Sequence, residues 1–216
     1  MKPLLQIAID SISKENIRII VQDAIACGID IIEIGNPGII VHGLGLIRDL
    51  KRDYPDITFY ADIKSIDFSF IETAQCFNYG AKYATVLTTS NDDNIKCALE
   101  TADNYGCEIV FSTMGHPRLD LPNRVMKIKE FGGKYFIAHG SGNSLSTAYS
   151  DLMKTIKCIK SCELPNIIFA GGITYDKVAA LCSRNPFALI IGRGICETKN
   201  YKETIFKIKS IINEFQ

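Results

Sequence analysis

The amino-acid sequence predicts a (β/α)8 barrel, and three observations support this fold class. Strand-like and helix-like segments alternate eight times along the 216 residues, which is the repeat of such a barrel. The strand-like segments are short, apolar and rich in β-branched residues, as expected for parallel strands covered on both faces. The residues at which they end lie 21 to 32 positions apart, so the repeating unit has a nearly constant length.

Turn residues separate the predicted elements. Gly28 ends an amphipathic first helix, and a loop rich in Gly and Pro follows the second strand. The predicted strands are residues 4–10, 30–34, 57–64, 83–87, 108–111, 134–138, 166–170 and 188–191. The predicted helices are residues 14–27, 43–52, 68–78, 91–104, 122–131, 146–160, 176–182 and 201–215. An open doubly wound sheet is the structural alternative, but residues 10–13 lack the Gly-rich first turn typical of that fold.

Composition and charge narrow the class of protein. Hydrophobic residues make up 47% and charged residues 22%, and we expect a single domain over residues 1–216. The 24 Lys and Arg residues equal the 24 Asp and Glu residues, so no basic excess indicates nucleic acid. No apolar stretch approaches the roughly 20 residues of a membrane span, and the first residues lack the pattern of a signal peptide. Eight scattered cysteines without a C-x-x-C motif indicate reduced thiols, and we predict a cytoplasmic protein.

The segment 61–67 contains the motif D-x-K-x-x-D at the end of the third predicted strand. Residues two apart in an extended chain point to the same side, so Asp62 and Lys64 should project together. Asp67 should lie where the chain turns into the next helix. Taken alone, the motif also fits a surface loop with an ion pair.

Polar residues and glycines recur where the predicted strands end, which is the face that carries the active site in such barrels. The first three strands contribute Asp10, Glu33, Asp62 and Lys64, and the sixth contributes His139. The last two strands lead into Ala-Gly-Gly-Ile and Gly-Arg-Gly-Ile, where bare backbone N–H groups can approach an anion. The predicted phosphate site consists of Gly171, Gly172, Gly192 and Arg193. The alternative is that the glycines only form tight turns.

Glu33 and Asp62 lie on adjacent strands, and two carboxylates brought together repel unless they share a cation. Oxygen ligands of this kind suit Mg²⁺, which takes one or two carboxylates together with substrate oxygens and water. A salt bridge from Glu33 to Lys64 is the alternative, and both arrangements can coexist. Asp10 is expected to pair with Lys64 or to bind substrate hydroxyls.

The three histidines differ in position. His139 follows the sixth strand and is suited to general acid–base catalysis near neutral pH, although a single histidine can also be structural. His42 and His116 lie in loops beside glycines, where they could close the site or be solvated.

Six segments in the expected order carry a family resemblance. They are residues 5–10, 31–37, 61–67, 138–140, 170–173 and 191–195. Together they resemble the orotidine 5′-phosphate decarboxylase suprafamily, whose signature is D-x-K-x-x-D. Within it, the sequence is most similar to the branch of 3-hexulose-6-phosphate synthase and 3-keto-L-gulonate-6-phosphate decarboxylase.

The resemblance implies a ribulose-phosphate-binding type of barrel that acts as a carbon–carbon lyase. It implies Mg²⁺ held near Glu33 and Asp62, chelating the oxygens of a sugar-phosphate 1,2-enediolate. Lys64 would stabilise the developing negative charge, and His139 would assist proton delivery. It also implies a homodimer in which Asp67 reaches into the neighbouring subunit's site.

The sequence departs from the branch pattern at three places. Asn36 replaces the usual Thr between Gly and Pro, Ser112 stands where relatives often carry an acid, and Asn143 stands where they tend to carry an Asp. These positions shape or contact the sugar, whereas the phosphate and metal residues are kept. We therefore expect the same class of chemistry on a substrate that the sequence leaves open, with the reaction of ribulose 5-phosphate and formaldehyde as the main hypothesis. The alternatives are a β-keto-acid decarboxylase similar to the 3-keto-L-gulonate-6-phosphate enzyme, and a barrel that binds a sugar phosphate without turnover.

Overall fold

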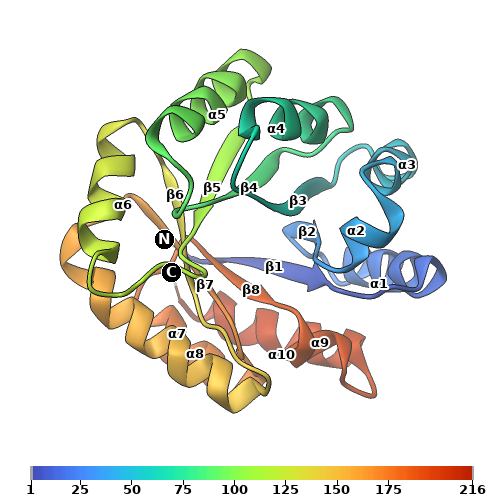
Figure 1. Ribbon diagram of the computed structural model, residues 1–216. Coiled ribbons are helices and arrows are strands. Elements are labelled where there is room, and N and C mark those ends of the chain that lie inside the picture. Colours follow the sequence, from blue (N-terminus) through green and yellow to red (C-terminus); the bar gives the residue numbers. More distant parts are fainter. Residues whose placement is uncertain (1, 216) are drawn as a thin grey trace.

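Eight parallel strands close into a barrel in the computed structural model, which describes residues 2–215 (Figure 1). Neighbours in the sequence are neighbours in the sheet, and β8 returns to pair with β1, which excludes the open sheet. The strands are β1 (Leu4–Ile9), β2 (Ile31–Ile34), β3 (Thr58–Ser65), β4 (Tyr83–Leu87), β5 (Glu108–Ser112), β6 (Tyr135–His139), β7 (Asn166–Ala170) and β8 (Ala188–Ile191). The predicted barrel is therefore confirmed. The predicted domain limits include residues 1 and 216, which lie outside the described residues.

Helices form the outer layer around the barrel (Figure 1). The longer ones are α1 (Lys14–Ala26), α3 (Gly45–Asp53), α4 (Ser69–Asn78), α5 (Asp92–Tyr105), α6 (Leu121–Glu130), α7 (Leu145–Ile159) and α10 (Tyr201–Asn213). The short ones are α2 (Gly38–His42), α8 (Val178–Cys182), α9 (Arg193–Cys196) and the 3₁₀ turns η1 (Lys160–Cys162) and η2 (Tyr175–Lys177). The sixteen predicted segments agree with these bounds to within two residues. The prediction missed α2 and α9, because four or five residues are too few to show a helical period.

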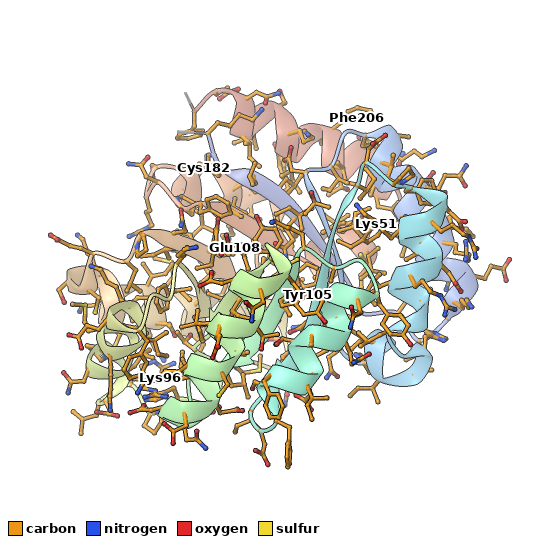
Figure 2. All side chains as sticks on the ribbon, turned by 90° about the horizontal axis from the view of Figure 1, so that it is seen from above. Lys51, Lys96, Tyr105, Glu108, Cys182 and Phe206 are labelled. Carbon is orange, nitrogen blue, oxygen red and sulfur yellow. The ribbon has the colours of Figure 1, made fainter. Side chains whose placement is uncertain are left out.

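Side chains alternate between two apolar cores along each strand. On β1, Leu5, Ile7 and Ile9 belong to the outer core between sheet and helices, whereas Ala8 belongs to the core inside the barrel. Figure 2 shows Tyr105 at the end of α5 beside α4, where its ring lies 5.7 Å from that of Phe77. Burial on both faces explains why the strands form apolar runs in the sequence.

Side-chain oxygens cap several of the long helices at their first residues. Ser13, Asn91 and Asn200 each accept a hydrogen bond from the backbone N–H three residues ahead, and Ser144 forms a capping box with Thr147. None of the helices within residues 2–215 has both the length and the apolar character needed to cross a membrane.

Asn94 on α5 anchors the loop that follows β3. Its Oδ1 accepts a hydrogen bond from the backbone N–H of Ser69 at 2.9 Å, and its Nδ2 donates to the carbonyl of Ile66 at 2.9 Å. Ser90 also donates to the Ile66 carbonyl, at 2.8 Å. Asn94 is buried, so these bonds are shielded from water. The end of the D-x-K-x-x-D motif is thus fixed by the neighbouring strand–helix unit.

Replacing Asn94 with alanine should therefore destabilise the protein. The buried N–H of Ser69 would lose its acceptor, and we expect the free energy of unfolding to fall by about 2–3 kcal/mol. Urea denaturation measures this loss. Asn104→Ala is the matched control, because Asn104 is exposed on the same helix and should change stability by less than about 0.5 kcal/mol. Equal losses in the two variants would contradict the anchoring role.

Candidate active site

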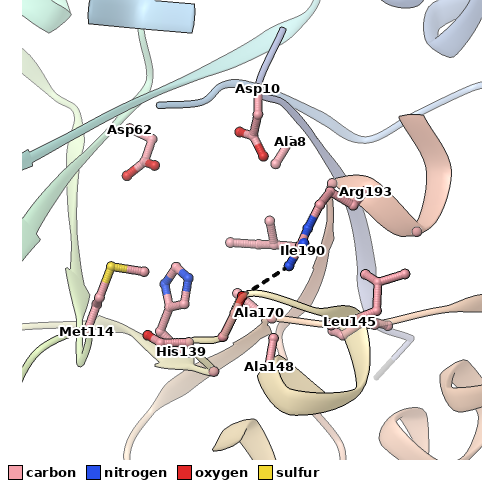
Figure 3. A pocket seen from close by; sticks show the side chains of 18 of the residues that line it. Ala8, Asp10, Asp62, Met114, His139, Leu145, Ala148, Ala170, Ile190 and Arg193 are labelled. Atoms are coloured by element: carbon pink, nitrogen blue, oxygen red, sulfur yellow. Dashed lines mark hydrogen bonds between the residues drawn. The ribbon is translucent and has the colours of Figure 1, made fainter. Parts of the chain in front are cut away.

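A cavity of about 360 Å³ opens at the carboxyl ends of the strands. Figure 3 shows the carboxylates of Asp10 and Asp62 and the ring of His139 entering this space from different strands. Nine of the ten predicted site residues line the cavity: Asp10, Glu33, Asp62, Lys64, His139, Gly171, Gly172, Gly192 and Arg193. The topology of the barrel therefore brings together residues that are up to 183 positions apart in the sequence. Asp67 is the predicted residue that does not line it.

Lys64 has an unusual backbone conformation at the end of β3. Its φ angle is 47°, in the left-handed region, and the pairing of β3 with β4 shifts register between Ala61 and Ser65. The regular extended geometry expected for the motif is therefore wrong at this residue. The Nζ of Lys64 nevertheless forms an ion pair with Oδ2 of Asp62, so the two side chains project together as predicted. Backbone strain of this kind costs about 1–3 kcal/mol and is concentrated at functional sites.

Three carboxylates share the single ammonium group of Lys64 in this cavity. Burial is the largest cause that raises the pKa of Glu33 well above its usual range, and the charges of Asp62 and Asp10 raise it further. The pKa of Asp10 rises to about 6, first because protein surrounds much of its carboxyl group and then because of Asp62. This carboxylate cluster, Asp10, Glu33 and Asp62, thus holds more negative charge than Lys64 can balance.

Buried polar residues inside the barrel form hydrogen bonds with the carboxylate cluster, and the sequence reasoning missed them. The Nε2 of Gln6 donates to the carboxylate of Glu33, and Lys64 pairs with Asp62. Within residues 2–215, the alternative salt bridge between Glu33 and Lys64 is therefore not formed. The Oγ1 of Thr85 lies 3.0 Å from Oδ1 of Asp62 and 2.8 Å from the hydroxyl of Tyr60. These residues occupy strand positions that face the inside of the barrel. A polar residue at such a position in an otherwise apolar strand is the feature of the sequence that could have identified them.

The carboxylate pair of Glu33 and Asp62 fits Mg²⁺ as its protein ligands. Within residues 2–215, no three His, Cys, Asp or Glu side chains are grouped to hold a metal ion. Mg²⁺ takes one or two carboxylates and completes its shell with substrate oxygens and water, so two ligands are enough. Burial and then the charges of Asp62 and Asp10 raise the pKa of Glu33, and a divalent cation would relieve the repulsion between these carboxylates.

Two consecutive glycines after β7 have conformations and surroundings that exclude a side chain. The φ angles are 112° at Gly171 and 64° at Gly172. A Cβ atom would lie 2.2 Å from the carbonyl oxygen of Gly140 in the first case and 2.1 Å from that of Leu145 in the second. The turn therefore packs directly against the segment after β6, and its backbone borders the cavity.

Arg193 lies at the start of α9 and reaches across the cavity rim. Its guanidinium group donates to the carbonyl oxygens of Gly142 and Asn143, each at 3.3 Å. These bonds use only part of its donors, so the remaining N–H groups can bind an anion beside the glycine turn. Asn143, one of the departures from the branch pattern, thus contributes its backbone here.

His139 projects into the cavity, but its electrostatic setting differs from the prediction. Burial, followed by the charge of Lys64, lowers its pKa to about 4. The expectation of acid–base titration near neutral pH is therefore wrong for this ring, which stays neutral at pH 7. The other two histidines lie elsewhere: His42 bonds to the carbonyl of Ile12, and His116 lies 3.2 Å from the hydroxyl of Thr88.

Asp67 does not line the cavity and is exposed to solvent. Its carboxylate accepts a hydrogen bond from the backbone N–H of Phe68 at 2.9 Å. A single chain thus does not bring Asp67 to the site. An exposed apolar surface surrounds it, made of Ile66, Phe68, Phe70 and Ile71.

Comparison with known proteins gives this fold and site a family. A model described as "Orotidine 5′-phosphate decarboxylase / HUMPS family" matches residues 3–208, and the chain belongs to this family. The resemblance inferred from the sequence is therefore confirmed.

Individual relatives point to one branch. The chain is 27% identical over 210 residues to 3-hexulose-6-phosphate synthase 2 of Staphylococcus saprophyticus, with 97% of each chain covered. The crystal structure of 3-hexulose-6-phosphate synthase from Salmonella typhimurium is 26% identical, with 100% of both chains covered and a TM-score of 0.90. The structure of 3-keto-L-gulonate-6-phosphate decarboxylase from Vibrio cholerae is 19% identical, with 100% of both chains covered and a TM-score of 0.86, and it shows the common fold alone.

We expect Gly172→Ala to destabilise the protein strongly. The left-handed backbone alone costs about 1–2 kcal/mol for a residue with a Cβ atom, and the overlap with the backbone of α7 should add about 1–3 kcal/mol. Gly106→Ala is the control, because Gly106 has a similar φ of 62° but open space around its Cβ position. The two free energies of unfolding, measured in guanidinium chloride, should differ by at least about 1 kcal/mol. Similar values would mean that the turn after β7 can move away from α7.

Proposed function

We propose that this chain is a carbon–carbon lyase that acts on a ketose phosphate through a 1,2-enediolate. The reaction that we assign is that of 3-hexulose-6-phosphate synthase, in which the enediolate of ribulose 5-phosphate adds to formaldehyde. The observation that carries the proposal is the carboxylate cluster around Lys64, which faces a glycine-rich, Arg-containing rim across one cavity. The relatives with this name cover nearly the whole chain.

One side of the cavity would bind the phosphate, and the other would stabilise the charge that develops on the sugar. Arg193 and the backbone of Gly171, Gly172 and Gly192 would hold the phosphate and fix the sugar in position. At the other side, Lys64 would offset the negative charge that develops on the sugar oxygens when a proton leaves C1.

Asp10 is the carboxylate that we assign as the base for this proton. Its pKa of about 6 leaves it mostly ionised at pH 7 and close to the optimum for proton transfer. It lines the cavity together with Lys64. A proton taken by Asp10 would thus leave the enediolate beside the ammonium group.

Glu33 and Asp62 would hold Mg²⁺ as the proposed cofactor. When bound, the ion would supply positive charge that stabilises the sugar oxygens of the enediolate. Gln6 and Thr85 would orient the two carboxylates, since each donates to one of them.

A cytoplasmic location stays a prediction.

An assay with ribulose 5-phosphate and formaldehyde tests the reaction. We expect turnover that EDTA abolishes and Mg²⁺ restores. Lys64→Met should lower kcat/KM by about 10²–10³-fold, because a preorganised charge at the enediolate is lost. Lys154→Met is the control, because Lys154 is exposed on α7 outside the cavity and should keep full activity.

Three outcomes of this assay would contradict parts of the proposal. Turnover that is insensitive to EDTA would remove Mg²⁺ and its ligands from it. Release of CO₂ from 3-keto-L-gulonate 6-phosphate without the formaldehyde reaction would replace the synthase with the decarboxylase. Full activity in Lys64→Met would remove the enediolate chemistry as a whole.

We also propose that the chain acts as a homodimer in which Asp67 completes the neighbouring site. The apolar surface around Asp67, with Phe68 59% and Ile66 51% exposed, supports a second copy of the chain as its occupant. This surface begins at Ile66, two residues after Lys64, so a partner bound here would lie close to the cavity rim.

Co-expression of two inactive variants tests this arrangement. Lys64→Met and Asp67→Asn chains with different tags should each be inactive alone, whereas the mixed dimer contains one site with both residues intact. We expect random pairing to restore about a quarter of wild-type activity. No recovery in the isolated mixed dimer, or a monomer by light scattering, would contradict the shared site.

A further inference from the structure

We infer that Ser112 is a positioning residue that holds His139 as the neutral tautomer with its proton on Nε2. Ser112 is the last residue of β5, and His139 is the last residue of the adjacent strand β6. In this arrangement His139 presents a hydrogen-bond donor, not a base, to the cavity. Its role in turnover rests on the proposed function, whereas the tautomer itself does not.

Ser112 is fully buried, with 0% of its surface exposed. Its Oγ already accepts a hydrogen bond from the backbone N–H of Met114 at 3.3 Å. Its own hydrogen needs an acceptor, because buried hydroxyls are hydrogen-bonded in folded proteins. Among the contacts of residues 2–215, Nδ1 of His139 at 3.3 Å is the acceptor available to it. The hydroxyl therefore donates to Nδ1, and Nδ1 carries no proton.

The surroundings of His139 lead to the same assignment. The backbone N–H of His139 donates to Oγ1 of Thr113 at 3.0 Å, which fixes the end of β6 and the position of the ring. Burial keeps the imidazole neutral at pH 7, so it holds one proton. With Nδ1 occupied as an acceptor, that proton lies on Nε2. The hydrogen bonds of His139 within residues 2–215 involve Nδ1 and the backbone N–H and not this nitrogen, and the residue lines the cavity.

The tautomer determines what His139 can do in the proposed reaction. A carboxylate at position 112 would accept a hydrogen bond from Nδ1–H and would leave Nε2 bare as a base. Ser112 has the opposite effect and presents Nε2–H. A carbonyl oxygen that gains negative charge as the new carbon–carbon bond forms would be stabilised by this donor until the proton taken from C1 by Asp10 neutralises the alkoxide, and His139 itself would transfer no proton.

Nitrogen-15 NMR of protein labelled at its histidines tests the tautomer without substrate. The spectrum contains three histidines, and the His139→Gln variant identifies the signals of His139. At pH 7 we expect a pyrrole-type Nε2 and a pyridine-type Nδ1 in the wild type. Ser112→Ala should reduce the preference for this tautomer by roughly fivefold or more, because one hydrogen bond is lost. Ser112→Asp should reverse it.

A second hydroxyl–imidazole pair provides the control. The hydroxyl of Thr88 lies 3.2 Å from Nδ1 of His116, outside the cavity. Thr88→Val should therefore change the signals of His116 and leave those of His139 unchanged. A proton on Nδ1 in the wild type, an imidazolium at pH 7, or an unchanged His139 spectrum in Ser112→Ala would each overturn the inference.

Kinetics separate this inference from the proposed function. If the wild type turns over ribulose 5-phosphate, Ser112→Ala should lower kcat by about tenfold and leave KM within about twofold. An unchanged kcat would remove the positioning role. A wild type without turnover would overturn the proposed function, while the NMR result would still decide the tautomer.

Discussion

Three carboxylates lie around the one ammonium group of Lys64, and this excess of negative charge is the constraint on which the rest of the site depends. Asp10, Glu33 and Asp62 come from three neighbouring strands, so closing the barrel forces them together whatever the local sequence prefers. Burial raises the pKa values of Glu33 and Asp10, and the repulsion between the carboxylates raises them further. Like charges are kept this close only where the surrounding structure holds them in place, and Gln6 provides one such hydrogen bond from inside the barrel.

The backbone around Lys64 shows how that crowding is accommodated. A left-handed residue and a register shift let β3 end with its ammonium group beside Asp62 instead of following the regular pleat. Such a conformation persists only when neighbouring contacts determine it. The contacts come from Asn94 and Ser90, which bind the chain two residues beyond Lys64. The unit β4–α5 therefore supports a site to which it contributes none of the predicted catalytic residues.

Sequence reasoning could predict the barrel and most of its rim, for a physical reason. The ends of parallel strands in a closed barrel lie at one face, so the order of strands alone places Asp10, His139 and Arg193 together. Local pattern could not predict features that depend on contacts between strands. The partner of Glu33, the conformation of Lys64 and the burial that keeps His139 neutral are of this kind. Asp67 lies at the turn into α4, as the sequence indicated, but its role in a neighbouring site rests on the resemblance and stays a prediction.

The charges around the cavity also bear on the proposed cofactor. With all groups ionised, the lining contains three carboxylates and two cations, Lys64 and Arg193. A sugar phosphate would add about two further negative charges, and an enediolate would add more. Arg193 lies near the glycine turn and Lys64 near the carboxylates, so neither can neutralise both ends of the substrate. A divalent cation between Glu33 and Asp62 would restore the balance where the new charge develops, and this deficit of positive charge is the strongest physical support for Mg²⁺ in the proposal.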